Sequence, residues 1–259
     1  MNLFILSVFA ILPSFLWLFY YFKKDKHPEP KRTLLYVFIV GSLFAFLGYY
    51  LQKYSVTGVI FLSNNFPDLG IFLIIFQKII IIAFSEELLK YLAFFFAARY
   101  HRDLDEPVDF IIYMITAALG FAAFENFLIL SSLTKPLLEN IITISALRFL
   151  SATFLHALAS GILGIFLVYA YQKSNKKIFI SGLTVATIIH AIYNFLIMRI
   201  DYYPVNIDIN LSIYDLQPIS TITLYPIFFL IFSFLIFLSV VLSIFIEKIK
   251  KLKSSSLKK

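Results

Sequence analysis

Seven long apolar stretches, separated by short polar connections, divide the chain almost from end to end. A helix needs about 20 predominantly apolar residues to cross the hydrocarbon core of a bilayer, and each stretch is close to that length. The pattern therefore predicts an all-α fold, a polytopic transmembrane helical bundle of about seven spans. The expected spans are residues 3–22, 33–51, 79–98, 108–130, 149–171, 178–199 and 222–246.

A shorter apolar segment, residues 69–76, precedes the third span and is separated from it by Gln77 and Lys78. It is too short to cross a bilayer by itself. Two interpretations are open. The segment is either an interfacial element on the outer side, in a position to act as a gate, or an extension of the third helix.

The composition agrees with a lipid environment. Hydrophobic residues make up 61% of the 259 residues and charged residues 14%, whereas soluble domains are about half apolar and about a quarter charged. A water-soluble fold could not hide this much hydrocarbon. The even spread of apolar stretches predicts one membrane-embedded domain, residues 1–247, followed by a basic tail, residues 248–259. The absence of cysteine excludes disulfides, thiolate metal sites and a thiol nucleophile.

The net charge of +7 is explained by where the basic residues lie. Most of them follow the first, third and fifth spans or belong to the tail, so that they fall on one side of the membrane. The positive-inside rule makes that side the cytoplasm, which places the N-terminus outside and the C-terminus in the cytoplasm. We therefore expect no nucleic-acid partner. The residues concerned are Lys23, Lys24, Lys26, Lys31, Arg32, Arg99, Arg102, Lys173, Lys176, Lys177 and the lysines from Lys248 to Lys259.

Ionisable side chains occur inside four of the predicted spans, where each costs about 2.5–3.5 kcal/mol on the mildest scale. A chain that only has to cross a membrane would not carry them. They define a motif core, residues 79–199. Its polar residues are Glu86, Glu87 and Lys90 in the third span, Glu125 and Asn126 in the fourth, Arg148 and His156 beside and within the fifth, and His190 and Asn194 in the sixth.

Four of these groups are expected at a common depth, roughly 8–14 Å below the outer surface at about 1.5 Å per residue. They are Glu86, Glu125, His156 and His190. Four helices would thus place polar groups in one layer. Within the third span, the helical repeat brings Lys90 close to both Glu86 and Glu87. Glu87 points about 100° away from Glu86 around the helix, so an anchoring role toward Lys90 or a neighbouring helix is open for it.

Several chemistries suit such a layer. A carboxylate shielded from water can act as a general base toward a water molecule, and histidine and asparagine can donate hydrogen bonds to a developing oxyanion. Histidine and carboxylate ligands also suit zinc or iron. A proton relay in a transporter is a third possibility, and the residues alone do not decide among the three.

At these positions the sequence resembles the PrsW family, which is grouped with the CAAX prenyl endopeptidases and the bacteriocin-immunity proteins. The resemblance covers about residues 86–194 and rests on four motifs in order, each in its own predicted span. One departure from the CAAX branch is Glu125, which stands where that branch has a histidine. The motifs are Glu86-Glu87-x-x-Lys90, Phe121-x-x-x-Glu125-Asn126, His156 with Gly161, and His190-x-x-x-Asn194.

The resemblance implies a glutamic-type intramembrane endopeptidase of the bacterial plasma membrane. In this interpretation Glu86 activates water against a peptide carbonyl. The groups implied to stabilise the oxyanion or orient the water are His156, His190 and Asn194. Glu87 and Glu125 complete the expected catalytic group, and the supporting residues are Lys90, Asn126 and Arg148.

No cofactor is expected from the resemblance, and zinc is the alternative. The expected partners are the lipid bilayer and a membrane-anchored protein substrate, for example an anti-sigma factor cut near the extracytoplasmic face. The oligomeric state is left open.

Two other functions compete with the protease. The first is a non-proteolytic membrane scaffold or immunity protein on the same fold, favoured by the lack of a soluble substrate-recognition domain and by the looser motif in the fourth span. The second is a metal-dependent membrane enzyme or an ion transporter that uses the same histidines and glutamates, although no HExxH spacing is present.

Overall fold

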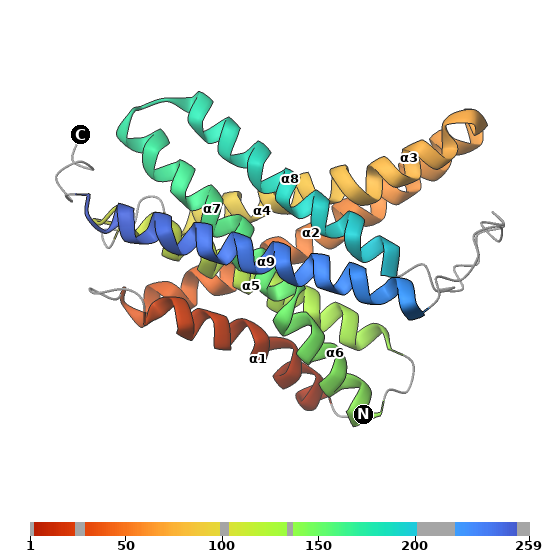
Figure 1. The fold of residues 1–259 in the computed structure, drawn as a ribbon, viewed down its shortest axis with the longest axis horizontal. Coiled ribbons are helices and arrows are strands. Elements are labelled where there is room, and N and C mark those ends of the chain that lie inside the picture. Colours follow the sequence, from red (N-terminus) through yellow and green to blue (C-terminus); the bar gives the residue numbers. More distant parts are fainter. Residues whose placement is uncertain (1–2, 24–28, 99–103, 134–136, 201–220, 253–259) are drawn as a thin grey trace.

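The computed structural model describes residues 3–23, 29–98, 104–133, 137–200 and 221–252. Within these ranges seven helical segments are long and apolar enough to cross a membrane, which confirms the predicted helical class, and they form one bundle (Figure 1). The helices are α1 (Leu3–Phe22), α2 (Lys31–Asn65), the 3₁₀ turn η1 (Pro67–Leu69), α3 (Gly70–Phe76), the π-helix η2 (Gln77–Ile81), α4 (Ile82–Ala97), α5 (Asp109–Ser132), α6 (Leu138–Leu150), α7 (Ala152–Gln172), α8 (Lys176–Ile200) and α9 (Thr221–Ile249).

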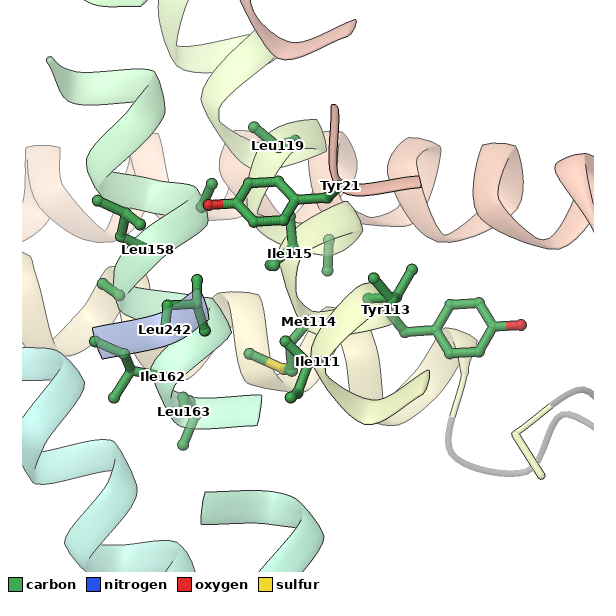
Figure 2. Close-up of a cluster of buried hydrophobic side chains, with 14 of the residues drawn as sticks. Tyr21, Ile111, Tyr113, Met114, Ile115, Leu119, Leu158, Ile162, Leu163 and Leu242 are labelled. Carbon is green, nitrogen blue, oxygen red and sulfur yellow. The ribbon is translucent and has the colours of Figure 1, made fainter. Parts of the chain in front are cut away.

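Helix α5 forms the centre of the bundle (Figure 1). It packs against α1, α2, α4 and α7, and it carries buried side chains around its whole circumference. Such a helix requires other helices on every side. Figure 2 shows the resulting core, in which Ile111, Met114 and Ile115 of α5 lie close to Leu158 and Leu163 of α7.

Helices α2 and α5 approach each other closely at two glycines. A Cβ atom added to Gly41 would lie 2.1 Å from the carbonyl oxygen of Ala117, and one added to Gly120 would lie 2.0 Å from that of Phe38. The Ser42 hydroxyl also donates a hydrogen bond to the Gly120 carbonyl oxygen, at 2.8 Å. Small residues at membrane helix interfaces permit such backbone contact, and here the contact determines where α2 lies.

The second span is longer than predicted. Helix α2 continues to Asn65, a length of about 52 Å at 1.5 Å per residue. The predicted end at residue 51 is wrong, because the polar side chains of Gln52 and Lys53 interrupt the apolar pattern without interrupting the backbone hydrogen bonds of a helix. The extension carries Gln52 into the polar centre of the protein.

Residues 69–76 extend the third helix, so the second of the two interpretations is the observed one. Elements η1, α3, η2 and α4 form one helical segment from Pro67 to Ala97. Helix α3 packs against α2, and the two project from the bundle as a hairpin (Figure 1). Within η2, Gln77 is buried and its amide donates a hydrogen bond to Ser55 Oγ of α2 at 3.0 Å.

Helix α6 is an element that the apolar pattern did not predict. It precedes α7, which begins at Ala152 near the expected start of the fifth span, and the helical dihedral angles are interrupted at Ser151 (φ −123°, ψ −87°). Helix α6 packs against α1 and α7, and it places Arg148 in its last turn.

Part of the predicted charge pattern lies outside the described residues: Lys24, Lys26, Arg99, Arg102 and the tail from residue 253 onward. The orientation of the termini across the membrane therefore stays a prediction, as does the assignment of residues 1–247 to one domain.

Replacing Gly120 by valine should destabilise the bundle. The new side chain would meet the Phe38 carbonyl, and overpacking of this kind costs about 1–3 kcal/mol. We expect a lower midpoint of thermal unfolding in detergent, followed by circular dichroism. Gly58→Ala is the matched control, because in the described parts of the chain no neighbouring atom lies within 4 Å of a Cβ placed there. An unchanged midpoint for Gly120→Val would contradict the close approach of α2 and α5.

Candidate active site

The carboxylate of Glu87 joins three helices. It lies on α4 and is completely buried. Its Oε1 accepts hydrogen bonds from Lys90 Nζ at 2.7 Å and from His190 Nδ1 of α8 at 2.8 Å. Its Oε2 accepts one from Ser160 Oγ of α7 at 3.1 Å. Both oxygens of Glu87 are therefore satisfied, as a charge buried away from water requires.

Glu86, the neighbouring residue on α4, has a different environment. Its Oε1 accepts a hydrogen bond from Gln52 Nε2 of α2 at 2.9 Å. Its Oε2 has no hydrogen-bond partner among the described residues, although Glu86 is only 3% exposed. The atoms that face Oε2 are Lys90 Nζ at 3.6 Å, His190 Nε2 at 3.7 Å and His156 Nδ1 at 4.0 Å. A buried carboxylate oxygen without a hydrogen bond is costly, and this one is available to a further ligand.

The ring state of His156 follows from its partners. The Lys90 ammonium group can only donate hydrogen bonds, so its 2.6 Å contact with His156 Nδ1 requires a lone pair on that nitrogen. The proton then lies on Nε2, which donates to Glu125 Oε2 at 2.9 Å. His156 thus accepts a hydrogen bond from Lys90 through Nδ1 and donates one to Glu125 through Nε2.

His190 is oriented by Glu87. The Glu87 carboxylate accepts a hydrogen bond from the N–H group of His190 Nδ1, so the other ring nitrogen, Nε2, faces Oε2 of Glu86. A carboxylate bound to one imidazole nitrogen fixes the tautomer and the direction of the second nitrogen, as it does in many hydrolases and metal sites. The two histidine rings lie edge to face, with their centroids 5.3 Å apart.

Glu125 and Asn126 of α5 connect this cluster to α6. Arg148 donates to Glu125 Oε2 at 2.9 Å and, through Nε, to Asn126 Oδ1. The Asn126 amide donates to the Ala10 carbonyl of α1 at 3.1 Å and to Thr153 Oγ1 at 3.2 Å. The Glu125 side chain is 30% exposed, so the cluster reaches the protein surface beside α6.

The structure brings the sequence-predicted site residues into one contact network, with the exception of Asn194. That residue lies one turn beyond His190 on α8 and is partly buried. Within the described residues no hydrogen bond of its side chain is found. The network comprises Glu86, Glu87, Lys90, Glu125, Asn126, Arg148, His156 and His190, and the catalytic roles of its members stay predictions.

Two contacts with the glutamates were not predicted from sequence. Gln52 was not among the predicted site residues because the expected second span ended one residue before it. Ser160 precedes Gly161 in the fifth span. A serine in an apolar helix does not by itself indicate which residue its hydroxyl binds. A search for polar residues on the continuation of each span would have found Gln52.

Glu86, His156 and His190 also suit a metal ion. One ligand atom from each lies within 4.8 Å of the others, Oε2 of Glu86 accepts no hydrogen bond from the described residues, and imidazole and carboxylate are zinc ligands. Lys90 competes for this position, because its ammonium group already binds Nδ1 of His156. An ion held by all three residues requires that the ammonium group leave that nitrogen.

Replacing Glu87 by glutamine should destabilise the protein, because the buried Lys90 ammonium group loses its closest counter-ion. Breaking a buried pair costs about 3–5 kcal/mol. The control is Glu247→Gln, which removes a carboxylate that is 66% exposed and lies 2.9 Å from Lys250; exposed pairs contribute about 0–1 kcal/mol. The measurement is the thermal unfolding midpoint in detergent, and equal midpoints for the two variants would show that Glu87 does not hold the cluster together.

Comparison with known proteins identifies the family. A family model described as PrsW family intramembrane metalloprotease matches residues 29–243. Protease PrsW of Oceanobacillus iheyensis is 32% identical over 190 residues, which cover 73% of this chain and 80% of the relative. Protease PrsW of Bacillus subtilis is 28% identical over 200 residues, with 73% and 80% covered. No solved structure matches the chain significantly.

The matched region contains the whole polar cluster, and the resemblance deduced from the four motifs is confirmed. Both relatives are proteases by name, the matching family model describes an intramembrane protease, and the seven apolar helical segments agree with a membrane location. The chain therefore belongs to the PrsW family and is an integral bacterial membrane protein with the activity of a membrane protease.

Proposed function

We propose that this protease is an intramembrane endopeptidase in which Glu86 activates a water molecule. The observation that carries the proposal is Oε2 of Glu86, which lies inside a buried polar cluster and has no hydrogen-bond partner among the described residues. Both oxygens of Glu87 are occupied by hydrogen bonds, so Oε2 of Glu86 is the oxygen of the pair that is left to accept a proton from water.

Hydrolysis then proceeds in two steps. As Oε2 of Glu86 takes a proton from water, the water oxygen bonds to the peptide carbonyl carbon and the carbonyl oxygen becomes an oxyanion. The Lys90 ammonium group, 3.6 Å from Oε2, is the positive charge placed to stabilise that oxyanion. In the second step the C–N bond breaks, and the proton held by Glu86 passes to the leaving amine.

The two histidines have different roles in this proposal. His190 Nε2 lies 3.7 Å from Oε2 of Glu86, in a position to carry the proton from Glu86 to the amine. His156 presents a lone pair to Lys90 and its N–H group to Glu125. It therefore positions the ammonium group rather than donating to the oxyanion itself. For Asn194, stabilising the oxyanion or orienting the water stays a prediction.

The proposed substrate is a membrane-anchored protein, for example an anti-sigma factor, cut near the extracytoplasmic face. The predicted orientation supports it, because it places Glu86 in the outer half of the expected third span, residues 79–98. The relatives support the protease class and so argue against the scaffold and transporter alternatives. The partly exposed Glu125 side chain marks the side on which a peptide segment could reach the buried carboxylates.

A metal-dependent mechanism on the same residues is the second candidate, favoured by the donor set and by the description of the matching family model. Glu86, His156 and His190 would hold the ion, and a zinc ion bound there would polarise the peptide carbonyl and activate water. In that case Lys90 would no longer bind His156 Nδ1.

Replacing Glu86 by glutamine should reduce kcat/KM about 100- to 10,000-fold, the usual contribution of a general base. The fold should persist, because the amide keeps the shape of the side chain. The assay uses reconstituted protein and a single-span membrane protein that accumulates uncut in cells lacking the protease. The control is Glu139→Gln, an exposed residue of α6, which should cleave normally. Full activity of Glu86→Gln would refute the mechanism.

Chelation should leave cleavage unchanged if Lys90 keeps its place on His156. We expect purified, active protein to contain less than stoichiometric zinc by elemental analysis and to retain its rate after dialysis against a chelator. Stoichiometric zinc that is lost together with activity, and that restores activity when added back, would replace water activation by Glu86 with the metal-dependent mechanism.

A further inference from the structure

Gln52 lies outside the four sequence motifs and contacts Glu86 directly. It belongs to the part of α2 beyond the predicted second span, and its Nε2 donates a hydrogen bond to Oε1 of Glu86 at 2.9 Å. No other hydrogen bond to this carboxyl group is found among the described residues, because Oε2 has none. The orientation of Glu86 therefore depends on a residue of a different helix.

The two oxygens of Glu86 are made unequal by this contact. The last torsion angle of a glutamate side chain has broad preferences, so the carboxyl plane is not determined by the side chain itself. With Oε1 bound to Gln52, Oε2 is directed toward Lys90 Nζ and His190 Nε2. Without this donor, either oxygen could occupy that position, and the carboxyl group could turn away from both.

The position of Gln52 is determined by close packing one turn earlier on α2. A Cβ atom added to Gly48 would lie 3.2 Å from side-chain atoms of both Leu89 of α4 and Phe121 of α5. The helix axis of α2 is thus held near α4, which keeps the Gln52 amide within reach of Glu86.

We infer that Gln52 is a positioning residue of the proteolytic site, which binds Oε1 of Glu86 and so presents Oε2 to the water and the peptide bond. The inference rests on the proposed role of Glu86 as the base. Gln52 exchanges no proton in the reaction. Its removal lowers the fraction of enzyme molecules with a correctly turned carboxylate, and substrate binding is unaffected.

Two variants separate this role from packing and from polarity. Gln52→Met keeps the length of the side chain and removes the donor, whereas Gln52→Asn keeps an amide that is one methylene too short to reach Oε1. We expect both to lower kcat about 10- to 100-fold, the usual loss when a group that orients a catalytic residue is removed. KM and the thermal unfolding midpoint should stay near those of the wild type.

The matched control is Gln77→Met. Gln77 is a second glutamine nearby; it is buried, whereas Gln52 is partly buried, and its amide binds Ser55 and not Glu86. Its kcat should equal that of the wild type. The measurements use the full chain in liposomes and the single-span membrane protein that accumulates uncut in cells lacking the protease, and Glu86→Gln is assayed beside the other variants.

The outcomes distinguish the positioning role of Gln52 from the catalytic role of Glu86. If Glu86→Gln is inactive and both Gln52 variants lose kcat at unchanged KM, the positioning role holds. A wild-type kcat for Gln52→Met or for Gln52→Asn overturns it, since packing alone or polarity alone would then suffice, and so does an equal loss in Gln77→Met. Full activity of Glu86→Gln overturns the proposed function itself, whatever the Gln52 variants do.

Discussion

The buried ion pair between Lys90 and Glu87 is the interaction on which the rest of the site depends. Neither side chain is exposed, and removing each charge from water costs several kcal/mol. That cost is offset because His190 and Ser160 also bind Glu87, while His156 accepts a hydrogen bond from Lys90. Helices α4, α7 and α8 must stay together for either charge to be tolerated within an apolar bundle.

This pair also explains why two adjacent glutamates behave differently. Successive residues of a helix point about 100° apart. Glu87 is therefore bound by residues of α7 and α8, whereas Oε1 of Glu86 is bound by Gln52 of α2. Glu87 neutralises Lys90 and is saturated with hydrogen bonds. Glu86 lies close to the same ammonium group, but its Oε2 accepts no hydrogen bond from the described residues. In the proposed mechanism, a structural carboxylate and a reactive one thus come from one turn of one helix.

A line of hydrogen bonds leads from this pair toward the surface. Lys90 donates to His156, His156 donates to Glu125, and Arg148 binds Glu125 from α6. In a medium of low dielectric such hydrogen bonds strengthen one another, so the loss of one weakens the others in the line. Arg148 is therefore connected to the buried centre and does more than anchor α6 at the membrane interface, and Asn126 ties the same arginine to α1.

The sequence by itself determined the helical membrane class and most members of the polar cluster. Both follow from local properties: bilayer thickness sets the length of an apolar stretch, and a charge inside such a stretch is conspicuous whatever surrounds it. Only the tertiary structure decided which partner each polar atom has. Gln52 reaches Glu86 because Gly41 and Gly120 let α2 and α5 touch, and Asn194 stays apart from the network although it lies one turn from His190. Distances and rotations between helices arise from packing among all of them, so the pattern of any single helix does not contain them.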